Sequence, residues 1–191
     1  MEQLRMWWNR KEVRPVCLPE GVTIRRFNGS DEDIDIWVDI AKHGLLAEDA
    51  DRDDYIGTML KHKDLDTNNI FIFEKDGASA ATITPIIFKD KNQGYIHMVA
   101  CKTEYRGIGI GSQLNNAAMK VLYDSCVPSA YLTTDDFRLA AIKSYITADF
   151  FPVLFADDME ERWCKILKQL NIESVDAVDA NGNFLKSIKG V

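Results

Sequence analysis

The sequence predicts an α/β fold in which helices flank a mixed sheet, and three observations lead to this prediction. Segments with the periodicity of strands and of helices follow one another in the order β-α-α-β-β-β-α-β-α-β. A glycine-rich run, Tyr105–Ser112, joins one strand to the next helix. The chain has 191 residues, 46% of them hydrophobic, which suits one domain with a full core. The mixed order implies antiparallel and parallel strand pairs in one sheet.

The first twenty residues are the hardest part of the chain to assign. Trp7 and Trp8 are large and apolar, and basic residues surround them. Pro15 and Pro19 then interrupt the segment. We expect residues 1–20 to form a short helix or an arm docked on the domain, with a dimer contact or a substrate lid as the alternatives.

Regular elements are easier to assign after residue 20. Ser30 and Asp33 form an N-cap pattern that starts a helix. The strands expected before and after it cover residues 22–27, 69–74, 78–88, 95–101, 130–134 and 150–155. The helices cover residues 30–45, 51–62, 110–122, 138–145 and 157–170. Asn181-Gly182 is a turn signal, so residues 176–188 form either a small terminal hairpin or a loose tail.

The glycine-rich run carries the most chemical information. It reads Tyr105-Arg106-Gly107-Ile108-Gly109-Ile110-Gly111-Ser112, between a strand and a helix N-terminus. Glycine has no Cβ, so a ligand can come close to the backbone. The N–H groups and the dipole at the start of a helix attract anions. The run therefore predicts a site for a phosphate or pyrophosphate.

Spacing distinguishes the known phosphate loops. A Walker A loop needs a lysine that is absent after Gly111. A Rossmann loop needs a third glycine where this chain has Ser112 or Leu114. The pattern R-x-x-G-x-G fits, with Arg106, Gly109 and Gly111. Here the chain resembles the GNAT superfamily of acyl-CoA-dependent N-acyltransferases, in which this loop holds the pyrophosphate of coenzyme A.

Two further segments extend this resemblance over residues 22–155. Residues 99–106 are similar to the family's L-x-V-x-P-E-Y-R, with Thr103 in place of proline. Residues 138–150 are similar to N-x-x-A-x-x-x-Y-x-x-x-G-F, with Arg138 in place of asparagine and Asp149 in place of glycine. The change to Thr103 is mild, the change to Arg138 affects one polar contact to the pantetheine arm, and the change to Asp149 alters the turn before the last core strand. None of the three removes the pyrophosphate site.

The resemblance implies a twisted mixed sheet of about six to seven strands, splayed between the family's fourth and fifth strands. Residues 21–156 then form the acetyltransferase domain, residues 1–20 an arm, and residues 157–191 a C-terminal helix and tail packed on it. Acetyl-CoA is the implied acyl donor. The implied binding residues are Val99, Ala100 and Cys101 along the strand, Arg106, Gly107, Ile108, Gly109, Ile110, Gly111 and Ser112 in the loop, and Arg138 and Ala141 on the later helix.

Two side chains are the implied catalytic residues. Tyr145 matches the family's tyrosine beside the sulfur, and a phenol is protonated at neutral pH, so it can donate to the leaving thiolate. The alternative is a tyrosine at the edge of the core. His97 is the candidate base, on the same strand face as Val99 and Tyr95, with a pKa near 6.5 that suits proton transfer. The alternative is a half-buried, hydrogen-bonded histidine. His43 and His62 fall near helix ends and are expected on the surface.

Acidic residues offer a further hypothesis about the acceptor. Asp135 and Asp136 either bind the amine or cap a helix. An acidic set in the region of the first two helices would attract a cationic amine, or forms a solvated helix face. This set comprises Asp31, Glu32, Asp33, Asp35, Glu48, Asp49, Asp51, Asp53 and Asp54.

Composition narrows the partners and the location. A net charge of −7 and a pI of about 5.0 disfavour a nucleic-acid partner. No apolar run is long enough for a membrane span. The four cysteines show no paired spacing, which favours reduced thiols and a cytoplasmic location, and scattered histidines give no metal site. A monomer and a homodimer are both compatible with the sequence.

The function expected is an acetyl-CoA-dependent N-acetyltransferase that acts on a primary amine of a small molecule or amino-acid-like acceptor. A protein N-terminus or a lysine side chain is the alternative acceptor. A non-catalytic CoA-binding sensor is the alternative of another class, which the change to Arg138 keeps open. An NAD- or ATP-binding enzyme is disfavoured by the glycine spacing.

Overall fold

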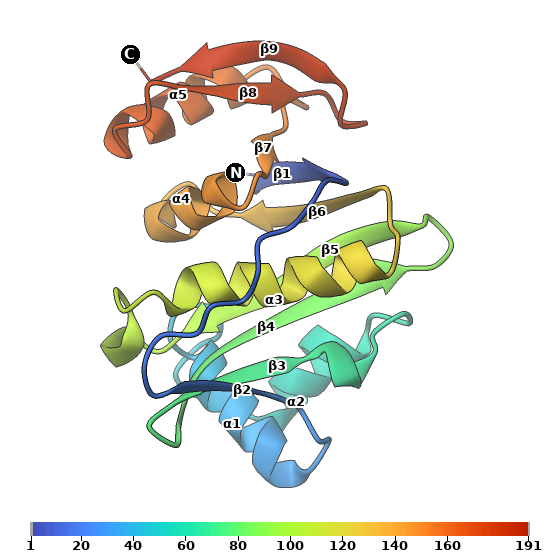
Figure 1. The fold of residues 1–191 in the computed structure, drawn as a ribbon, viewed down its shortest axis with the longest axis vertical. Coiled ribbons are helices and arrows are strands. Elements are labelled where there is room, and N and C mark those ends of the chain that lie inside the picture. The colour runs from blue at the N-terminus through green and yellow to red at the C-terminus, as the bar shows by residue number, and fades with distance from the viewer. Residues whose placement is uncertain (1, 191) are drawn as a thin grey trace.

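The structure, a computed structural model, describes residues 2–190. A seven-stranded sheet runs through the molecule in the order β2-β3-β4-β5-β6-β1-β7, with a separate hairpin of β8 and β9 (Figure 1). Only β5 and β6 pair in parallel in the large sheet. The strands are β1 Leu4–Asn9, β2 Val22–Arg26, β3 Phe71–Lys75, β4 Ala78–Phe88, β5 Gln93–Cys101, β6 Ser129–Thr134, β7 Phe151–Pro152, β8 Ser174–Val178 and β9 Phe184–Lys189. The expected mixed α/β fold is confirmed.

Helices cover both faces of the sheet. The elements are α1 Asp31–Ala41, α2 Arg52–Tyr55, the π-helical η1 Ile56–Leu60, the short η2 Thr67–Asn69 and η3 Thr103–Tyr105, α3 Ile110–Asp124, α4 Leu139–Thr147 and α5 Met159–Gln169. Apolar residues of α3, α4 and α5 share one core with the sheet. Those of α1, α2 and η1 share a second core. We call these two faces the α3 face and the α1 face.

The first strand departs from the expectation for residues 1–20. Residues 4–9 are neither a helix nor an arm, because they pair along their whole length with β6, antiparallel. Leu4, Met6 and Trp8 are buried in the core of the α3 face, while Trp7 turns to the α1 face. The period-two alternation of apolar residues was present in the sequence, but the surrounding charges obscured it. Pairing with β1 satisfies backbone groups of β6 that would otherwise form an open edge.

The C-terminal segment forms a hairpin rather than a loose tail. β8 and β9 pair, and β9 lies against α5. Leu154 N donates to Val178 O at 2.9 Å, which ties the hairpin to the end of the large sheet. The side-chain amide of Asn9 donates to Gly182 O at 2.9 Å, so the turn of the hairpin rests on β1 (Figure 1). The first and last strands therefore stabilise one another.

The connection between β1 and β2 crosses α3 (Figure 1). Cys17 N donates to Gln113 Oε1 at 2.7 Å, and Asn116 Nδ2 donates to Pro15 O at 3.1 Å. These contacts hold residues 10–20 along the helix that follows the glycine-rich run. Within residues 2–190, no helix is long and apolar enough to cross a membrane.

Candidate active site

The central parallel strand pair separates at its carboxyl end. β5 and β6 pair only at Gly94–Ala130, Tyr95–Tyr131 and Ile96–Leu132. β5 then continues to Cys101 without pairing with β6. Backbone groups of residues 97–101 on that side are therefore available to a ligand. This is the splay that the family resemblance implied between the family's fourth and fifth strands. Those two strands are β5 and β6 in this protein, because the additional strand at residues 4–9 is numbered β1.

A bulge in β5 changes which way its side chains point. Thr84 of β4 pairs with His97, whereas Thr82 pairs with Ala100, so β5 holds one extra residue. Met98 carries the bend with φ 50°. Simple alternation predicted that His97 and Val99 share one face of the strand. Because of the bulge they lie on opposite faces. Val99 packs on the α3 face, while His97 and Tyr95 face the other side.

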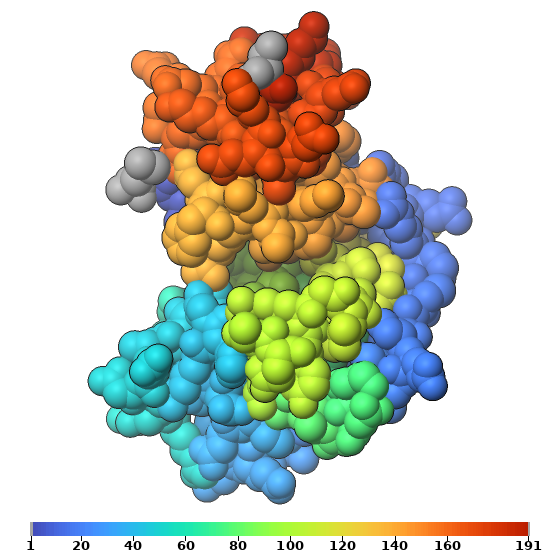
Figure 2. Space-filling view, turned by 90° about the vertical axis from the view of Figure 1, so that its left-hand side faces the viewer, coloured from blue at the N-terminus to red at the C-terminus, as the bar shows by residue number. Residues whose placement is uncertain are grey.

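A cavity of about 650 Å³ opens at the splay. In the space-filling view it is a hollow between α4 and the loop that leads into α3 (Figure 2). Eight of the expected binding residues line it: Val99, Ala100, Cys101, Arg106, Gly107, Gly111, Arg138 and Ala141. Tyr145 and His97 line it as well. Ile108, Gly109, Ile110 and Ser112 do not, although they belong to the same loop and helix start.

The loop before α3 has the conformation that its glycines permit. Gly107 and Gly109 have φ of 83° and 92°, which L-residues rarely adopt. A Cβ added at Gly107 or Gly111 would meet no atom within 4 Å, so the space over the loop is open. Ile110, in contrast, is 1% exposed and anchors the helix in the core. Free N–H groups at the start of α3 thus face an open space, which fits a pyrophosphate.

Arg106 holds the loop in place. Its Nε donates to Cys101 O at 3.1 Å, at the end of β5. One of its terminal nitrogens donates to His43 O at 2.6 Å. His43 in turn accepts a hydrogen bond from Thr103 N at 3.2 Å. Arg106 therefore connects the strand, the loop and the end of α1, and His43 is part of this support rather than an isolated surface residue.

Tyr145 reaches the cavity from the α3 face. It is 5% exposed, and its ring packs edge to face on Phe150, with 6.3 Å between centroids and 65° between ring planes. Burial raises the pKa of the Tyr145 phenol, so it stays protonated at neutral pH. Phe150 N donates to Tyr145 O at 3.0 Å across the turn at Asp149. Asp149 has φ 67°, so it adopts the left-handed conformation that glycine would supply, and the turn is kept.

His97 reaches the cavity from the α1 face and is 8% exposed. Its Nε2 lies 3.4 Å from Thr58 O, which can only accept, so we assign the proton to Nε2. Nδ1 then accepts from the Tyr95 hydroxyl at 3.3 Å. Burial first, and the neighbouring His62 second, lower the pKa of His97 to about 4. The imidazole is therefore neutral at pH 7, and its pKa lies well below the ordinary value of 6.5 that the sequence analysis assumed.

His62 is a neighbour that sequence reasoning missed. It was expected on the surface, but its ring meets that of His97 edge to face, with 4.6 Å between centroids. Its Nε2 is buried and has no hydrogen-bond partner among the described residues. Burial, and then Lys61, lower the pKa of His62. Its position at the end of a predicted helix gave no sign of this contact, because the contact depends on how η1 packs against β5.

The two aspartates after β6 have different roles. Asp135 lines the cavity and accepts from Gln3 Nε2 at 2.9 Å and from Arg138 Nε at 2.8 Å. Arg138 stands at the start of α4, and Asp135 orients it at the cavity wall. Asp136 points away and accepts two hydrogen bonds from Arg162, which is 9% exposed. These bonds lower the pKa of Asp136 and connect the loop after β6 to α5.

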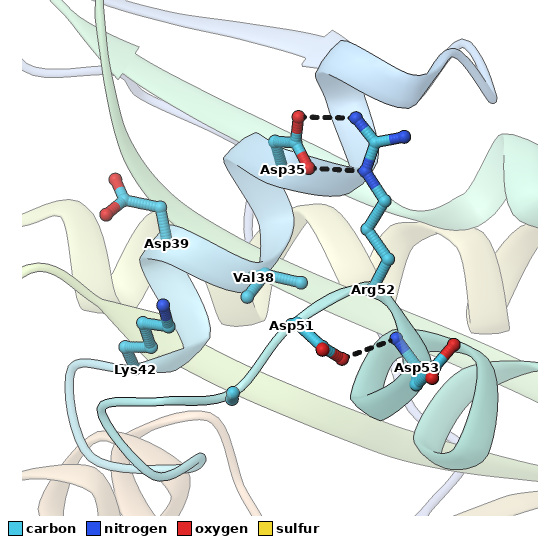
Figure 3. A pocket seen from close by; sticks show the side chains of 8 residues that line it. Asp35, Val38, Asp39, Lys42, Asp51, Arg52 and Asp53 are labelled. Atoms are coloured by element: carbon cyan, nitrogen blue, oxygen red, sulfur yellow. Dashed lines mark hydrogen bonds and ion pairs between the residues drawn. The ribbon is translucent and has the colours of Figure 1, made fainter.

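The acidic set around the first two helices does not line the cavity. Asp33 is 2% exposed and forms an ion pair with Arg25. Asp35 is bridged to Arg52, and Asp51 accepts from Asp53 N at the start of α2 (Figure 3). The pocket of about 500 Å³ in that figure shares no residue with the cavity at the splay. None of the set forms part of the cavity wall, and the hypothesis that it attracts a cationic amine stays a prediction.

No group of three histidine, cysteine or acidic residues among residues 2–190 is arranged to hold a metal ion. The four cysteines are free thiols. Cys101 lines the cavity, and burial raises the pKa of its thiol.

Comparison with known proteins identifies the architecture. The family model described as "Acetyltransferase (GNAT) family" matches residues 33–150. A search of curated proteins by sequence found no match. Among solved structures, a GCN5-related N-acetyltransferase from Sphaerobacter thermophilus matches with a TM-score of 0.65 and 21% identity, over 78% of this chain and 48% of that one. The chain thus spans about half the length of that protein.

Two other matches cover more of the known protein. The ribosomal-protein-S18-alanine N-acetyltransferase of Escherichia coli matches with a TM-score of 0.54 and 17% identity, over 66% of this chain and 75% of that one. An aminoglycoside acetyltransferase from an uncultured soil metagenomic sample matches with a TM-score of 0.54 and 14% identity, over 67% and 87%. At these identities the matches show a common fold and leave the acceptor open.

Proposed function

Because the chain belongs to the GNAT acetyltransferase family and is an acyltransferase, we propose that it transfers the acetyl group of acetyl-CoA to a primary amine of a small molecule. One observation carries the proposal. A single cavity joins the open glycine loop, the unpaired edge of β5 and the phenol of Tyr145. These are the parts needed to hold a pyrophosphate, an amide-bearing arm and a leaving thiolate.

The residues of the cavity suit the pyrophosphate and the pantetheine arm of acetyl-CoA. The N–H groups at the start of α3 and the open space at Gly107 and Gly111 suit the pyrophosphate. The free backbone of residues 97–101 suits the amide groups of the pantetheine arm. When bound, acetyl-CoA would supply an activated thioester, and Tyr145 and His97 line the same cavity from opposite faces of the sheet. Arg138, held by Asp135, takes the wall position where the family has an asparagine.

The two polar side chains would then divide the proton transfers. Tyr145 is protonated and donates from the α3 face to the departing sulfur. Tyr95 donates its hydroxyl proton to Nδ1 of His97 and can accept one from the amine, so the pair passes a proton away from the nucleophile. A pKa of about 4 makes His97 a weak base. It would therefore take the proton from an amine that is already neutral when it binds, either directly or through a bridging water.

Both acceptor classes occur among the matched structures, since one printed name gives a ribosomal protein and another an aminoglycoside. The small-molecule acceptor is favoured here because the aromatic and histidine side chains beside the splay form a short, partly buried surface. This surface comprises His62, Phe88, Tyr95, His97 and Tyr131. A protein N-terminus or lysine remains the second candidate.

Ligand-dependent melting tests the proposal first. Acetyl-CoA and CoA should raise the melting temperature, whereas NAD and ATP should not, because a ligand that binds only the folded state stabilises it. Acetylation of a small-amine library and of peptides, followed by thiol release, then separates the two acceptor classes. No shift with any CoA species would refute the proposal. A shift without turnover on any amine would favour the sensor.

A further inference from the structure

Arg5 has a charge for which the described part of the protein provides no partner. It lies on β1 and is half-buried, and its Nε is buried without a hydrogen-bond acceptor among residues 2–190. No carboxylate within those residues forms an ion pair with it. A buried guanidinium donor without an acceptor is costly, and such groups often indicate a missing ligand or ion.

Aromatic rings surround this guanidinium. Its carbon lies 5.2 Å from the ring centre of Phe155 and 5.9 Å from that of Tyr131. Ring contacts of this kind orient an arginine, but they leave its N–H groups free for a planar anion. The rings therefore orient the guanidinium of Arg5 without neutralising its charge.

Arg5 stands on the same sheet face as the proposed proton acceptor. β6 separates the two strands, and Arg5 pairs across it with Thr133. The parallel register that pairs Ile96 with Leu132 brings Thr133 alongside His97. Two strand spacings give about 10 Å between the backbones of Arg5 and His97, and the splay widens this.

A continuous row of rings fills the space between them. Tyr131 stacks on Tyr95 with 4.8 Å between centroids, and Tyr95 lies 5.2 Å from His97. All three are only partly exposed or buried. A small flexible molecule that lies along these rings would reach the guanidinium at one end and the Tyr95–His97 pair at the other.

We propose that Arg5 binds a carboxylate of the acceptor, so that the acceptor is an amine separated from a carboxylate by several bonds. This inference rests on the proposed acetyl transfer and specifies its substrate class. The carboxylate accepts two hydrogen bonds from the guanidinium, in the bidentate geometry that arginine favours. The amine then lies near Tyr95 and His97.

A length series of paired acceptors tests the proposal. The probes are glycine, β-alanine, 4-aminobutanoate, 5-aminopentanoate and 6-aminohexanoate, each beside its primary amide. In the wild-type protein, kcat/KM for the longer acids should exceed that for their amides by roughly 10- to 100-fold, the range expected for a hydrogen-bonded ion pair. In Arg5→Gln the preference should vanish while turnover of the amides is kept. Arg5→Lys, which keeps the charge, should retain part of it.

Arg10 supplies the matched control. It also stacks on a tyrosine, with its guanidinium carbon 4.3 Å from the ring centre of Tyr123, but that ring belongs to α3 and not to the row of rings that ends at His97. Arg10→Gln should keep the acid preference. Melting temperatures of all variants establish that they are folded.

Separate readouts distinguish the two proposals. Failure of acetyl-CoA to stabilise the protein would refute the acetyl transfer itself. Acetyl-CoA binding with equal use of acids and amides, or an acid preference that survives in Arg5→Gln, would overturn only the role of Arg5. If no probe is acetylated, the melting temperature of the CoA-saturated protein is measured with 6-aminohexanoate and with its amide. A larger shift with the acid would support the proposal, and equal shifts would overturn it.

Discussion

The imidazole rings of His62 and His97 meet edge to face, with 4.6 Å between their centroids. His97 belongs to β5 and His62 to the turn after η1, so the contact exists only in the folded protein. Two protonated rings at this distance would repel one another, and burial disfavours either charge. The pair is therefore held neutral at the edge of the cavity, which has measurable consequences.

Stability should depend on pH through His97. Its pKa is about 4 in the folded protein, against about 6.5 when unfolded. Between these values the unfolded chain binds a proton that the folded protein does not. The free energy of unfolding should therefore fall as pH is lowered from about 6.5 to about 4, by up to about 3 kcal/mol. Denaturant unfolding across this range should show a shallower fall for His97→Gln, and equal slopes would contradict the prediction.

Replacement of Tyr145 by phenylalanine should separate binding from chemistry. The variant loses the proton donor while the ring contact with Phe150 stays, so we expect kcat to fall by about 100-fold or more with acetyl-CoA binding kept. Thiol release and ligand-dependent melting measure the two effects. Tyr123→Phe, outside the cavity, is the control. An unchanged kcat in Tyr145→Phe would remove Tyr145 from the mechanism.

A negative charge in the loop should act oppositely on stability and binding. Gly111 lies in the first turn of α3 with open space over it, so Gly111→Glu places a carboxylate at the positive end of the helix. The free protein should keep or gain stability, by about 0.3–1 kcal/mol. Acetyl-CoA affinity should fall at least about tenfold, because the carboxylate occupies the pyrophosphate position. Gly57→Glu, at another open glycine, should leave affinity intact.

Asp136 should matter for folding and not for the acceptor. Asp136→Asn removes the closer of the two carboxylates that pair with the nearly buried Arg162, so the free energy of unfolding should fall by about 1–3 kcal/mol. KM for the amine should not change. Asp157→Asn, at an exposed neighbour, should do neither. A higher KM for the amine in Asp136→Asn without lost stability would place Asp136 in the acceptor site instead.

The contact between the two ends of the chain can be tested at Gly182. Its φ is 82°, and a Cβ there would lie 2.1 Å from Trp7 Nε1. Gly182→Ala should therefore lower the free energy of unfolding by more than the backbone strain of about 1–2 kcal/mol alone. Gly29→Ala has nearly the same φ, 81°, with nothing within 4 Å, so it measures that strain by itself. Equal losses of unfolding free energy in both variants would show that Trp7 moves away from the new methyl group without destabilising the protein.

Local signals in the sequence were sufficient for much of the structure. The N-cap at Ser30 is seen as a hydrogen bond from Asp33 N. The glycine run lies between β5 and α3 as predicted, because backbone conformation at glycine and the start of a helix are properties of a few adjacent residues. The same holds for the helical spacing that places Ala141 and Tyr145 at one cavity.

Contacts between distant segments were decided only by the tertiary structure. The extra residue at Met98 reversed the side-chain alternation of β5, and alternation alone cannot reveal a bulge. Packing of η1 against β5 brought His62 to His97 and lowered both pKa values. The partner of β1 lies more than a hundred residues further along the chain, in β6. The sequence by itself thus determined most of the elements after residue 20 and the glycine-rich loop, whereas long-range pairing and burial determined the first strand and the protonation and placement of the groups around the loop.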